Sequence, residues 1–220
     1  MTETVQSAIA AQLDALQIPS HIDTDTYPSI VALFEEALAK YRDQAACSSV
    51  GHTLSYADLD RLSAHFAGWL QHGAGLARGD RVAIQMPNLI QYLVVCLGAL
   101  RAGMVVVNTN PLYTERELEH QLNDANVKVM VVQANVAQTA AAVLPKTDVE
   151  TVVVTEIADL HPQPKRTLIN FLVKYVKRMV PAFSIPGALK LNAVLKAGAK
   201  TPYRAVILNR DELAMLQYTG

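Results

Sequence analysis

Short runs of valine and isoleucine alternate with longer helical periods through the middle of the chain. These runs are apolar at nearly every position, whereas a strand with one face in water is apolar only at every second residue. They therefore indicate strands that are buried on both faces. The sequence thus predicts an α/β fold with a mainly parallel sheet flanked by helices on both faces. Its strands are expected near Val82–Met86, Val105–Asn108, Val129–Val132, Val152–Val154 and Leu213–Tyr218.

Helix start signals locate the layers that cover this sheet. Pro28 and Ser29 precede an apolar face that recurs at helical spacing from Ile30 to Tyr41. Ser55 is a favourable N-cap, with Asp58 at the third helical position of the next helix. Further helices are expected over LIQYLVVCLGALRAG, over ERELEHQLNDA after the cap Thr114, and near residues 136–144.

The composition is that of a folded globular domain. The chain has 220 residues, of which 51% are hydrophobic and 18% are charged, so it can bury one sizeable core. Its only cysteines are Cys47 and Cys96, and their number and spacing predict neither a disulfide framework nor a zinc site. The sequence also contains no pattern typical of a signal peptide or of a membrane-spanning helix. We therefore expect a cytoplasmic protein.

The formal net charge of −1 hides a strong division along the chain. Between Leu160 and Arg210 there are ten lysines and arginines and no acidic residue, whereas the rest of the chain holds nine basic and twenty acidic residues. Such asymmetry is typical of a surface that meets an anionic partner. Because no nucleic-acid recognition motif accompanies the basic residues, nucleic acid is not an expected partner.

Most of these basic residues lie in residues 165–204, which we call the basic segment. Part of this segment has an amphipathic pattern. On a helix over Leu168–Phe183, one face carries Leu168, Leu172, Tyr175, Val176, Met179 and Phe183, and the other carries Asn170, Lys174, Lys177 and Arg178. The pattern is typical of a helix lying in a membrane interface. It equally fits a helix that docks its apolar face on the protein's own core. The hypothesis for 165–204 is peripheral attachment to the inner face of the membrane.

Several polar residues near the expected strand ends have two interpretations. Gly103 is expected to let the chain turn tightly from a helix into the next strand. Asn108 and Thr109 follow a strand, where they would either shape a turn or contact a ligand, and turn chemistry is the favoured interpretation. His120 lies beside acidic residues on a helix and is expected to be a solvated surface histidine rather than a catalytic one.

The order of four segments resembles one enzyme superfamily. HTLSYADLDRLSAHFAGWL, GDRVAIQMPN, LGALRAGMVVVNTNPLYTERELEHQLNDA and LQYTG occur in the order and spacing of AMP-forming acyl-CoA synthetases, which are adenylate-forming enzymes. The resemblance spans residues 27–220, and bacterial long-chain fatty acid–CoA ligases are the most similar members. It implies that residues 1–220 form the amino-terminal part of the AMP-binding domain, with the rest of the enzyme absent.

The resemblance also implies a reaction and its cofactors. Such ligases join a fatty acid to ATP as an acyl-adenylate, release pyrophosphate, and then form the thioester with coenzyme A; Mg²⁺ assists. Tyr218, Thr219 and Gly220 match the start of the family's phosphate loop and are the expected ATP-binding residues, although alone they would suit any strand-to-turn exit. No catalytic residue and no metal ligand of the family falls within this chain. The fragment is therefore expected to be inactive, with no cofactor bound.

Other functions remain open on the sequence. The acid-binding pocket of these enzymes lies mostly in segments that would follow Gly220, so a ligase for a medium-chain or aromatic carboxylate is an alternative. A non-catalytic α/β module that docks on membranes is a second alternative, from a different class. The resemblance further implies a homodimer, because family members often associate through their amino-terminal regions.

Overall fold

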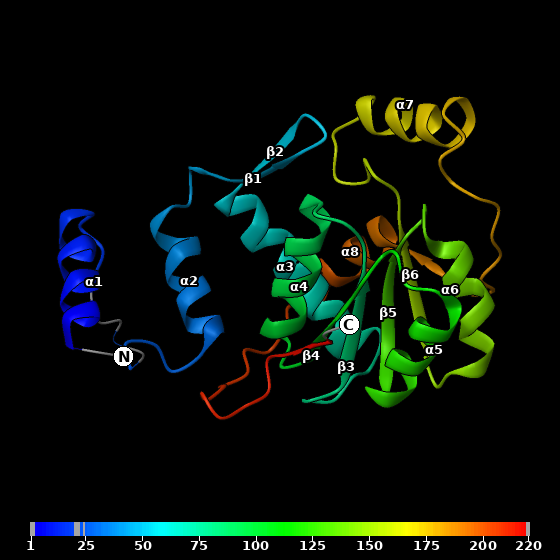
Figure 1. Cartoon of the computed structure of the whole chain (residues 1–220). Coiled ribbons are helices and arrows are strands. Elements are labelled where there is room, and N and C mark those ends of the chain that lie inside the picture. Colours follow the sequence, from blue (N-terminus) through cyan, green and yellow to red (C-terminus); the bar gives the residue numbers. More distant parts are fainter. Residues whose placement is uncertain (1–2, 20–22, 24, 219–220) are drawn as a thin grey trace.

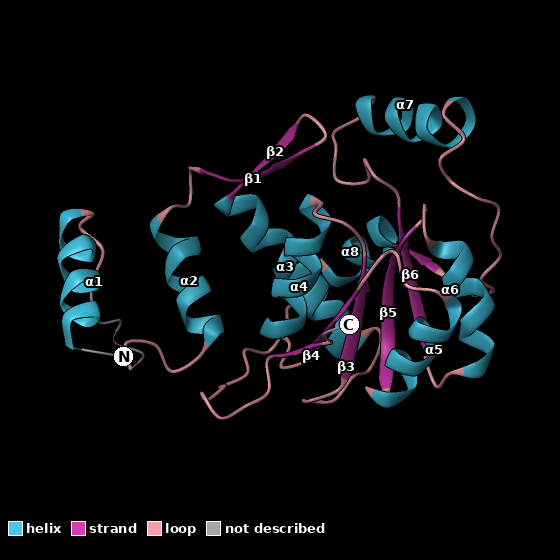
Figure 2. Ribbon diagram, viewed as in Figure 1, coloured by secondary structure: helices cyan, strands magenta, loops and turns pink. Residues whose placement is uncertain are grey.

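A computed structural model describes residues 3–19, 23 and 25–218. Its centre is a six-stranded sheet in the order β7-β6-β5-β3-β4-β8, in which every neighbouring pair is parallel (Figure 2). The predicted α/β fold with a parallel sheet is confirmed. The strands are β3 (Arg81–Gln85), β4 (Val105–Thr109), β5 (Val127–Gln133), β6 (Thr151–Thr155), β7 (Leu189–Lys190) and β8 (Met215–Gln217).

Helices cover both faces of this sheet, and each face has its own apolar core. The helices of the first face are α2 (Ile30–Lys40), α3 (Tyr56–His72), α4 (Ile90–Arg101) and α8 (Leu191–Gly198), and those of the second are α5 (Glu115–Asp124) and α6 (Ala137–Val143). The first core lies between the sheet and the helices α2, α3, α4 and α8, and the second between the sheet and α5 and α6. Successive residues of one strand alternate between them, so that Val106 belongs to the first core and Val107 to the second.

Two helices begin at the predicted caps. The side chain of Ser55 accepts a hydrogen bond from the backbone of Asp58, and the Asp58 carboxylate accepts one from the Ser55 backbone. Thr114 and Glu117 form the same reciprocal pair at the start of α5. Because each pair satisfies amides that a helix start would leave free, both helices begin where the sequence predicts. Ser55 also ends the antiparallel hairpin of β1 (Ala45–Ser49) and β2 (His52–Ser55).

One buried charge joins the helices of the first face. Arg101 at the end of α4 is only 3% exposed. Its guanidinium lies 2.7 Å from the carboxylate of Glu35 on α2 and 2.5 Å from that of Asp60 on α3, and it donates to the hydroxyl of Ser63 at 2.7 Å. The ring of Tyr203 lies 5.5 Å from the guanidinium. These contacts satisfy the buried cation and fix three helices relative to one another.

The basic segment departs from the prediction. Its first helix, α7 (Lys165–Phe171), continues as a π-helical stretch over Leu172–Val176 and ends there, so the predicted helix over Leu168–Phe183 is too long. Arg178 has a φ of 53°, which lies outside the helical region, and Pro181 lacks the amide that a continuing helix would use. Phe183 therefore leaves the predicted apolar face and packs against the second core.

Two further differences concern elements at the sheet's edges. The strand β7 and the helix α8 lie within the basic segment and were not predicted as elements. The strand expected over Leu213–Tyr218 is shorter, and its prediction as a buried strand is wrong. Met215 of β8 is 38% exposed because β8 pairs with β4 on one side and forms the edge of the sheet on the other.

Two segments stand away from the sheet (Figure 1). The helix α1 (Glu3–Ala15) lies beyond α2 at the left of the view, and α7 lies above the upper end of the sheet at the right. Among the residues whose side chains are described, α1 buries none, and α7 buries none. No helix in the described part of the chain is long and apolar enough to cross a membrane.

The crossing of α3 and α8 depends on glycine. A Cβ atom on Gly198 would overlap the backbone carbonyl oxygen of His65, and one on Gly68 would overlap that of Thr201. Since these obstacles are backbone atoms, no side-chain rotation relieves them. The two helices can approach this closely only because neither glycine has a side chain.

We predict that Gly198→Ala lowers the free energy of unfolding by about 3 kcal/mol, because the added methyl group forces the helices apart. Urea unfolding followed by circular dichroism measures this as a lower midpoint with an unchanged slope. Ala197→Ser, at an exposed position of the same helix, is the control and should change stability by less than about 0.5 kcal/mol. Equal midpoints for Gly198→Ala and the unmodified chain would contradict the close packing.

Candidate functional site

The carboxyl ends of the parallel strands share one edge of the sheet, where α/β proteins commonly bind ligands. Tyr218 leaves β8 at this edge. Its ring packs against the second core, and its hydroxyl donates to the carboxylate of Asp124 at 2.5 Å. Burial, with the nearby Asp124 carboxylate, raises the pKa of Tyr218 to about 12, so the hydroxyl keeps its proton at neutral pH. Thr219 and Gly220, the other predicted ATP-binding residues, lie outside the described residues.

Asn108 connects three elements at the same edge. Its side-chain oxygen accepts from the hydroxyl of Tyr92 on α4 at 2.8 Å, and its amide donates to Gln217 of β8 at 2.9 Å. Burial raises the pKa of Tyr92 to about 12, which keeps this donor protonated. The hydroxyl of Thr109 reaches the carbonyl oxygen of Val107 at 3.4 Å. These contacts favour a supporting role for Asn108 and Thr109 over direct contact with a ligand.

The turn after β4 has the predicted chemistry. The side chain of Asn110 accepts from the backbone amide of Leu112 at 2.9 Å, and the backbone amide of Tyr113 donates to the carbonyl oxygen of Asn110 at 3.2 Å. The ring of Tyr113 packs against the second core. Gly103, which precedes β4, has a φ of 82°, a conformation that favours glycine. His120 is exposed on α5, as predicted.

Two buried glutamines at this edge were not singled out from the sequence. Gln121 donates to the carbonyl oxygen of Asn108 at 2.9 Å, and Gln85 donates to that of Asn110 at 3.2 Å. Within the described part of the chain, the amide oxygens of both glutamines lack a hydrogen-bond partner. In the sequence, Gln85 is the one polar residue of the run Val82–Met86, and this interruption of an apolar run could have indicated its role.

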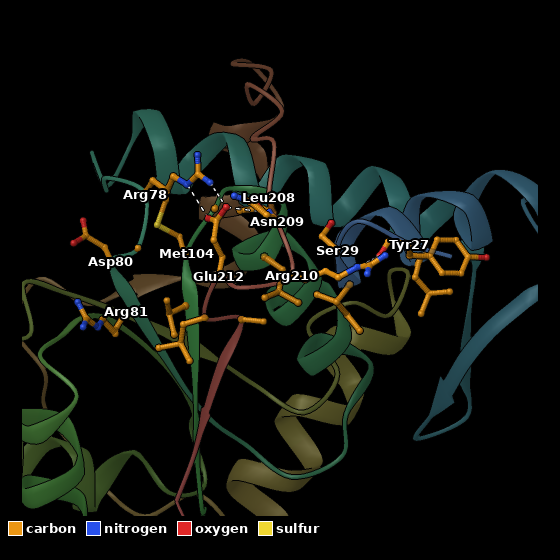
Figure 3. A pocket seen from close by; sticks show the side chains of 18 residues that line it. Tyr27, Ser29, Arg78, Asp80, Arg81, Met104, Leu208, Asn209, Arg210 and Glu212 are labelled. Carbon is orange, nitrogen blue, oxygen red and sulfur yellow. Dashed lines mark hydrogen bonds and ion pairs between the residues drawn. The ribbon is translucent and has the colours of Figure 1, made fainter. Parts of the chain in front are cut away.

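A separate cavity lies at the opposite edge of the sheet, before the strands begin. It has a volume of 660 Å³ and is lined in part by Gly79, Met104 and Leu213. Figure 3 shows Arg78 pointing toward Glu212 on its wall, where the Nε atom of Arg78 lies 3.0 Å from a carboxylate oxygen. Arg78 is already paired with Glu212, and the cavity is far from the carboxyl edge. We therefore do not propose this cavity as the nucleotide-binding site.

Metal ligands do not gather in the described residues: no group of three or more histidine, cysteine, aspartate or glutamate side chains is arranged there to hold a metal ion. The two cysteines are free thiols, Cys47 half-buried in β1 and Cys96 buried in α4. Burial raises the pKa of the Cys96 thiol to about 11, which leaves it unreactive at neutral pH. The described residues therefore offer neither a metal cluster nor a reactive thiol at Cys96.

Comparison with known proteins gives a family for this scaffold. The model of the AMP-binding enzyme family matches residues 34–220. The chain is 46% identical over 203 residues to a long-chain-fatty-acid–CoA ligase of Escherichia coli O157:H7, and 32% identical over 194 residues to one of Bacillus subtilis. The first alignment covers 92% of this chain and 36% of the relative, and the second covers 87% and 34%. The chain thus spans about a third of the length of these relatives.

Solved structures of lower sequence identity share the fold. An anthranilate CoA ligase in complex with anthranoyl-AMP superposes with a TM-score of 0.69 at 17% identity, over 90% of this chain and 32% of that one. A long-chain-fatty-acid-CoA ligase from Archaeoglobus fulgidus superposes with a TM-score of 0.65 at 22% identity, over 87% of this chain and 34% of that one.

Proposed function

The chain belongs to the AMP-binding enzyme family, and we propose that it is the amino-terminal part of a long-chain fatty acid–CoA ligase. The observation that carries the proposal is the 46% identity over 203 residues to a ligase of that specificity. In the proposed reaction, the fatty acid carboxylate displaces pyrophosphate from the α-phosphorus of ATP. The thiol of coenzyme A then displaces AMP from the acyl-adenylate and forms the thioester.

Within this ligase, residues 1–220 supply the first part of the AMP-binding domain. Tyr218, Thr219 and Gly220 would begin the loop that receives the phosphates of ATP. The anchoring of Tyr218 on Asp124 supports this assignment, because it fixes the point from which the loop departs at the carboxyl edge. Mg²⁺ would neutralise charge on the phosphates when bound, and the chain's own contribution is to position the strand that leads into the loop.

The test joins this chain to the remainder of the Escherichia coli O157:H7 relative. We predict that the chimera catalyses palmitate-dependent exchange of pyrophosphate into ATP and forms palmitoyl-CoA, whereas residues 1–220 alone catalyse neither. The reason is that the resemblance places the groups that stabilise charge at the α-phosphorus in segments outside residues 1–220. Measurable exchange by residues 1–220 alone would contradict the proposed division of the site.

Parallel assays address the alternatives. Octanoate and benzoate replace palmitate to test for a medium-chain or aromatic substrate. The intact Escherichia coli relative serves as the control for the assay itself. A well-folded chimera without exchange on any of the three acids would overturn the ligase proposal and favour the non-catalytic module.

We also propose that the α7 arm, residues 165–179, contacts the surface of a membrane. Six large apolar side chains recur along the arm at positions i, i+3, i+4, i+7, i+8 and i+11, and none is covered: Leu168, Phe171, Leu172, Tyr175, Val176 and Met179 are between 39% and 63% exposed. This pattern supports the membrane interpretation over docking on the protein's own core. Lys174, Lys177 and Arg178 add positive charge beside the stripe.

The helix α8, later in the basic segment, does not expose its apolar side chains in this way. On α8, Leu191, Val194 and Leu195 are buried in the first core. This burial supports the interpretation of a docked helix with a solvated basic face for α8. The proposed membrane contact is accordingly narrower than the predicted range 165–204.

We predict that the chain co-sediments with anionic vesicles at low salt and largely dissociates at high salt, because screening shortens the reach of charge to about 10 Å at 0.1 M. Each lysine or arginine near an anionic surface contributes about 1 kcal/mol. Replacing Lys174, Lys177 and Arg178 with glutamine should therefore weaken low-salt binding by about tenfold or more.

The matched control replaces Lys190, Lys200 and Arg204 with glutamine, which removes the same charge from the basic segment outside the α7 arm. It should bind vesicles nearly as well as the unmodified chain. Equal weakening by the two triple variants would show that net charge, and not the α7 arm, governs binding.

The predicted homodimer stays a prediction. Val5 and Ile9 on α1 are 45% and 46% exposed, so this amino-terminal helix is the place to test for a contact with a second copy. Light scattering at rising concentration should then show twice the monomer mass, with a shift toward monomer in the Ile9→Ser variant.

A further inference from the structure

A second cavity, of 410 Å³, lies between α3, α8, the hairpin strand β2 and the loop that joins β6 to α7. Its volume falls within the range of about 300–1,000 Å³ that is typical of small-ligand pockets. Three cationic side chains from three different helices line it: Arg61 of α3, Arg166 of α7 and Lys196 of α8. Residues that are far apart in the sequence thus bring positive charge to one place.

The two carboxylates in this cavity are already occupied. Asp58 pairs with Arg61 at 2.9 Å and caps α3. Asp159, which is 8% exposed, accepts from the hydroxyl of Thr155 at 3.1 Å and from the backbone amide of Glu156 at 2.8 Å. Its other oxygen accepts from the side-chain amide of Asn170 at 3.1 Å.

Two of the cations have no such partner. Neither Arg166 nor Lys196 forms an ion pair with any described residue. The guanidinium of Arg166 lies 2.8 Å from the side-chain amide of Gln163, and its charge acts on the carboxyl of Asp159. Because the carboxylates that line the cavity are held by other donors, neither forms a close ion pair with Arg166 or Lys196.

A buried histidine lines the same cavity with one atom unpaired. His161 is 4% exposed, and its Nε2 atom lies 3.0 Å from the carbonyl oxygen of Val50. A carbonyl oxygen only accepts, so Nε2 carries a proton and donates. The Nδ1 atom has no partner in the described part of the chain, although buried polar atoms are almost always paired. The ring of His52 lies beside it, with 5.0 Å between the centroids.

We propose that this cavity binds a phosphate group, from either a soluble phosphomonoester or an anionic lipid headgroup. Arg166 and Lys196 would neutralise its negative charge, and the planar guanidinium of Arg166 suits two phosphate oxygens at once. The ring of His161 lines the same cavity, so a phosphate held by these two cations would lie beside it. The cavity lies apart from Tyr218, so the proposal goes beyond acyl-CoA ligation and stands without it.

The test is calorimetric titration of the full chain with inorganic phosphate at constant ionic strength. We expect saturable binding by the unmodified chain and a loss of about tenfold or more in the double variant Arg166→Gln/Lys196→Gln, because two charge-assisted contacts are removed. The control is Lys190→Gln/Lys200→Gln, which removes the same charge outside the cavity and should bind phosphate as the unmodified chain does.

Nuclear magnetic resonance of the histidine rings locates the bound phosphate. The Nδ1 signal of His161 should shift on titration, and that of the exposed His120 should not. Absence of saturable phosphate binding, equal binding by the two double variants, or a saturable titration that leaves the His161 signal unchanged would each overturn the proposal.

Vesicles distinguish the two sources of phosphate. Phosphatidic acid carries a phosphomonoester, whereas phosphatidylglycerol carries a phosphodiester. If the headgroup is the natural ligand, Arg166→Gln/Lys196→Gln should weaken binding to phosphatidic acid vesicles more than to phosphatidylglycerol vesicles. If the ligand is a soluble phosphomonoester, that variant should lose inorganic phosphate and bind both vesicles as the matched control does. Neither result depends on acyl-CoA ligation.

Discussion

The requirement that both faces of a parallel sheet be covered governs this structure. Consecutive valines such as Val106 and Val107 point to opposite faces, and both are fully buried. At about 25 cal/mol per Å² of apolar surface removed from water, neither face is stable without its helices. The first face is closed by helices that pack closely enough to exclude a side chain at Gly198, and the buried Arg101 fixes their relative positions. Packing therefore sets the framework before any polar chemistry is added.

This covering leaves the strand ends as the places where polar groups can meet a ligand. At the carboxyl edge, Asn108 links α4, β4 and β8, and Tyr218 is held on Asp124. These bonds fix the exit of β8, an edge strand with a partner on one side. Without them, the loop that leaves β8 would start from a strand that is held on one side only. The polar contacts thus supply the rigidity that packing provides for the central strands.

The sequence predicts the central strands and the capped helices well because their signals are local. Ser55 with Asp58 marks a helix start by itself, and so does Thr114 with Glu117. The features that the sequence did not predict are set by contacts between residues that are distant in the sequence. A helical pattern from Leu168 onward shows an apolar face but not where the helix ends. The buried environments of Arg101 and Gln85 come from residues distant in the sequence.

The two halves of the basic segment show that composition alone does not determine burial. α8 follows the short strand β7 and is drawn into the first core, where Leu191 and Leu195 are buried. The α7 arm lies between β6 and β7 in the chain, but none of its residues packs in either core. Asn170 anchors the arm to the loop after β6 through polar contacts. Its side chain accepts from the backbone amide of Ala158 at 2.9 Å and donates to Asp159 at 3.1 Å. A polar anchor on one face of a helix fixes its rotation, and this one keeps the apolar stripe directed away from the core. An uncovered stripe held in that way is a stable feature of the fold.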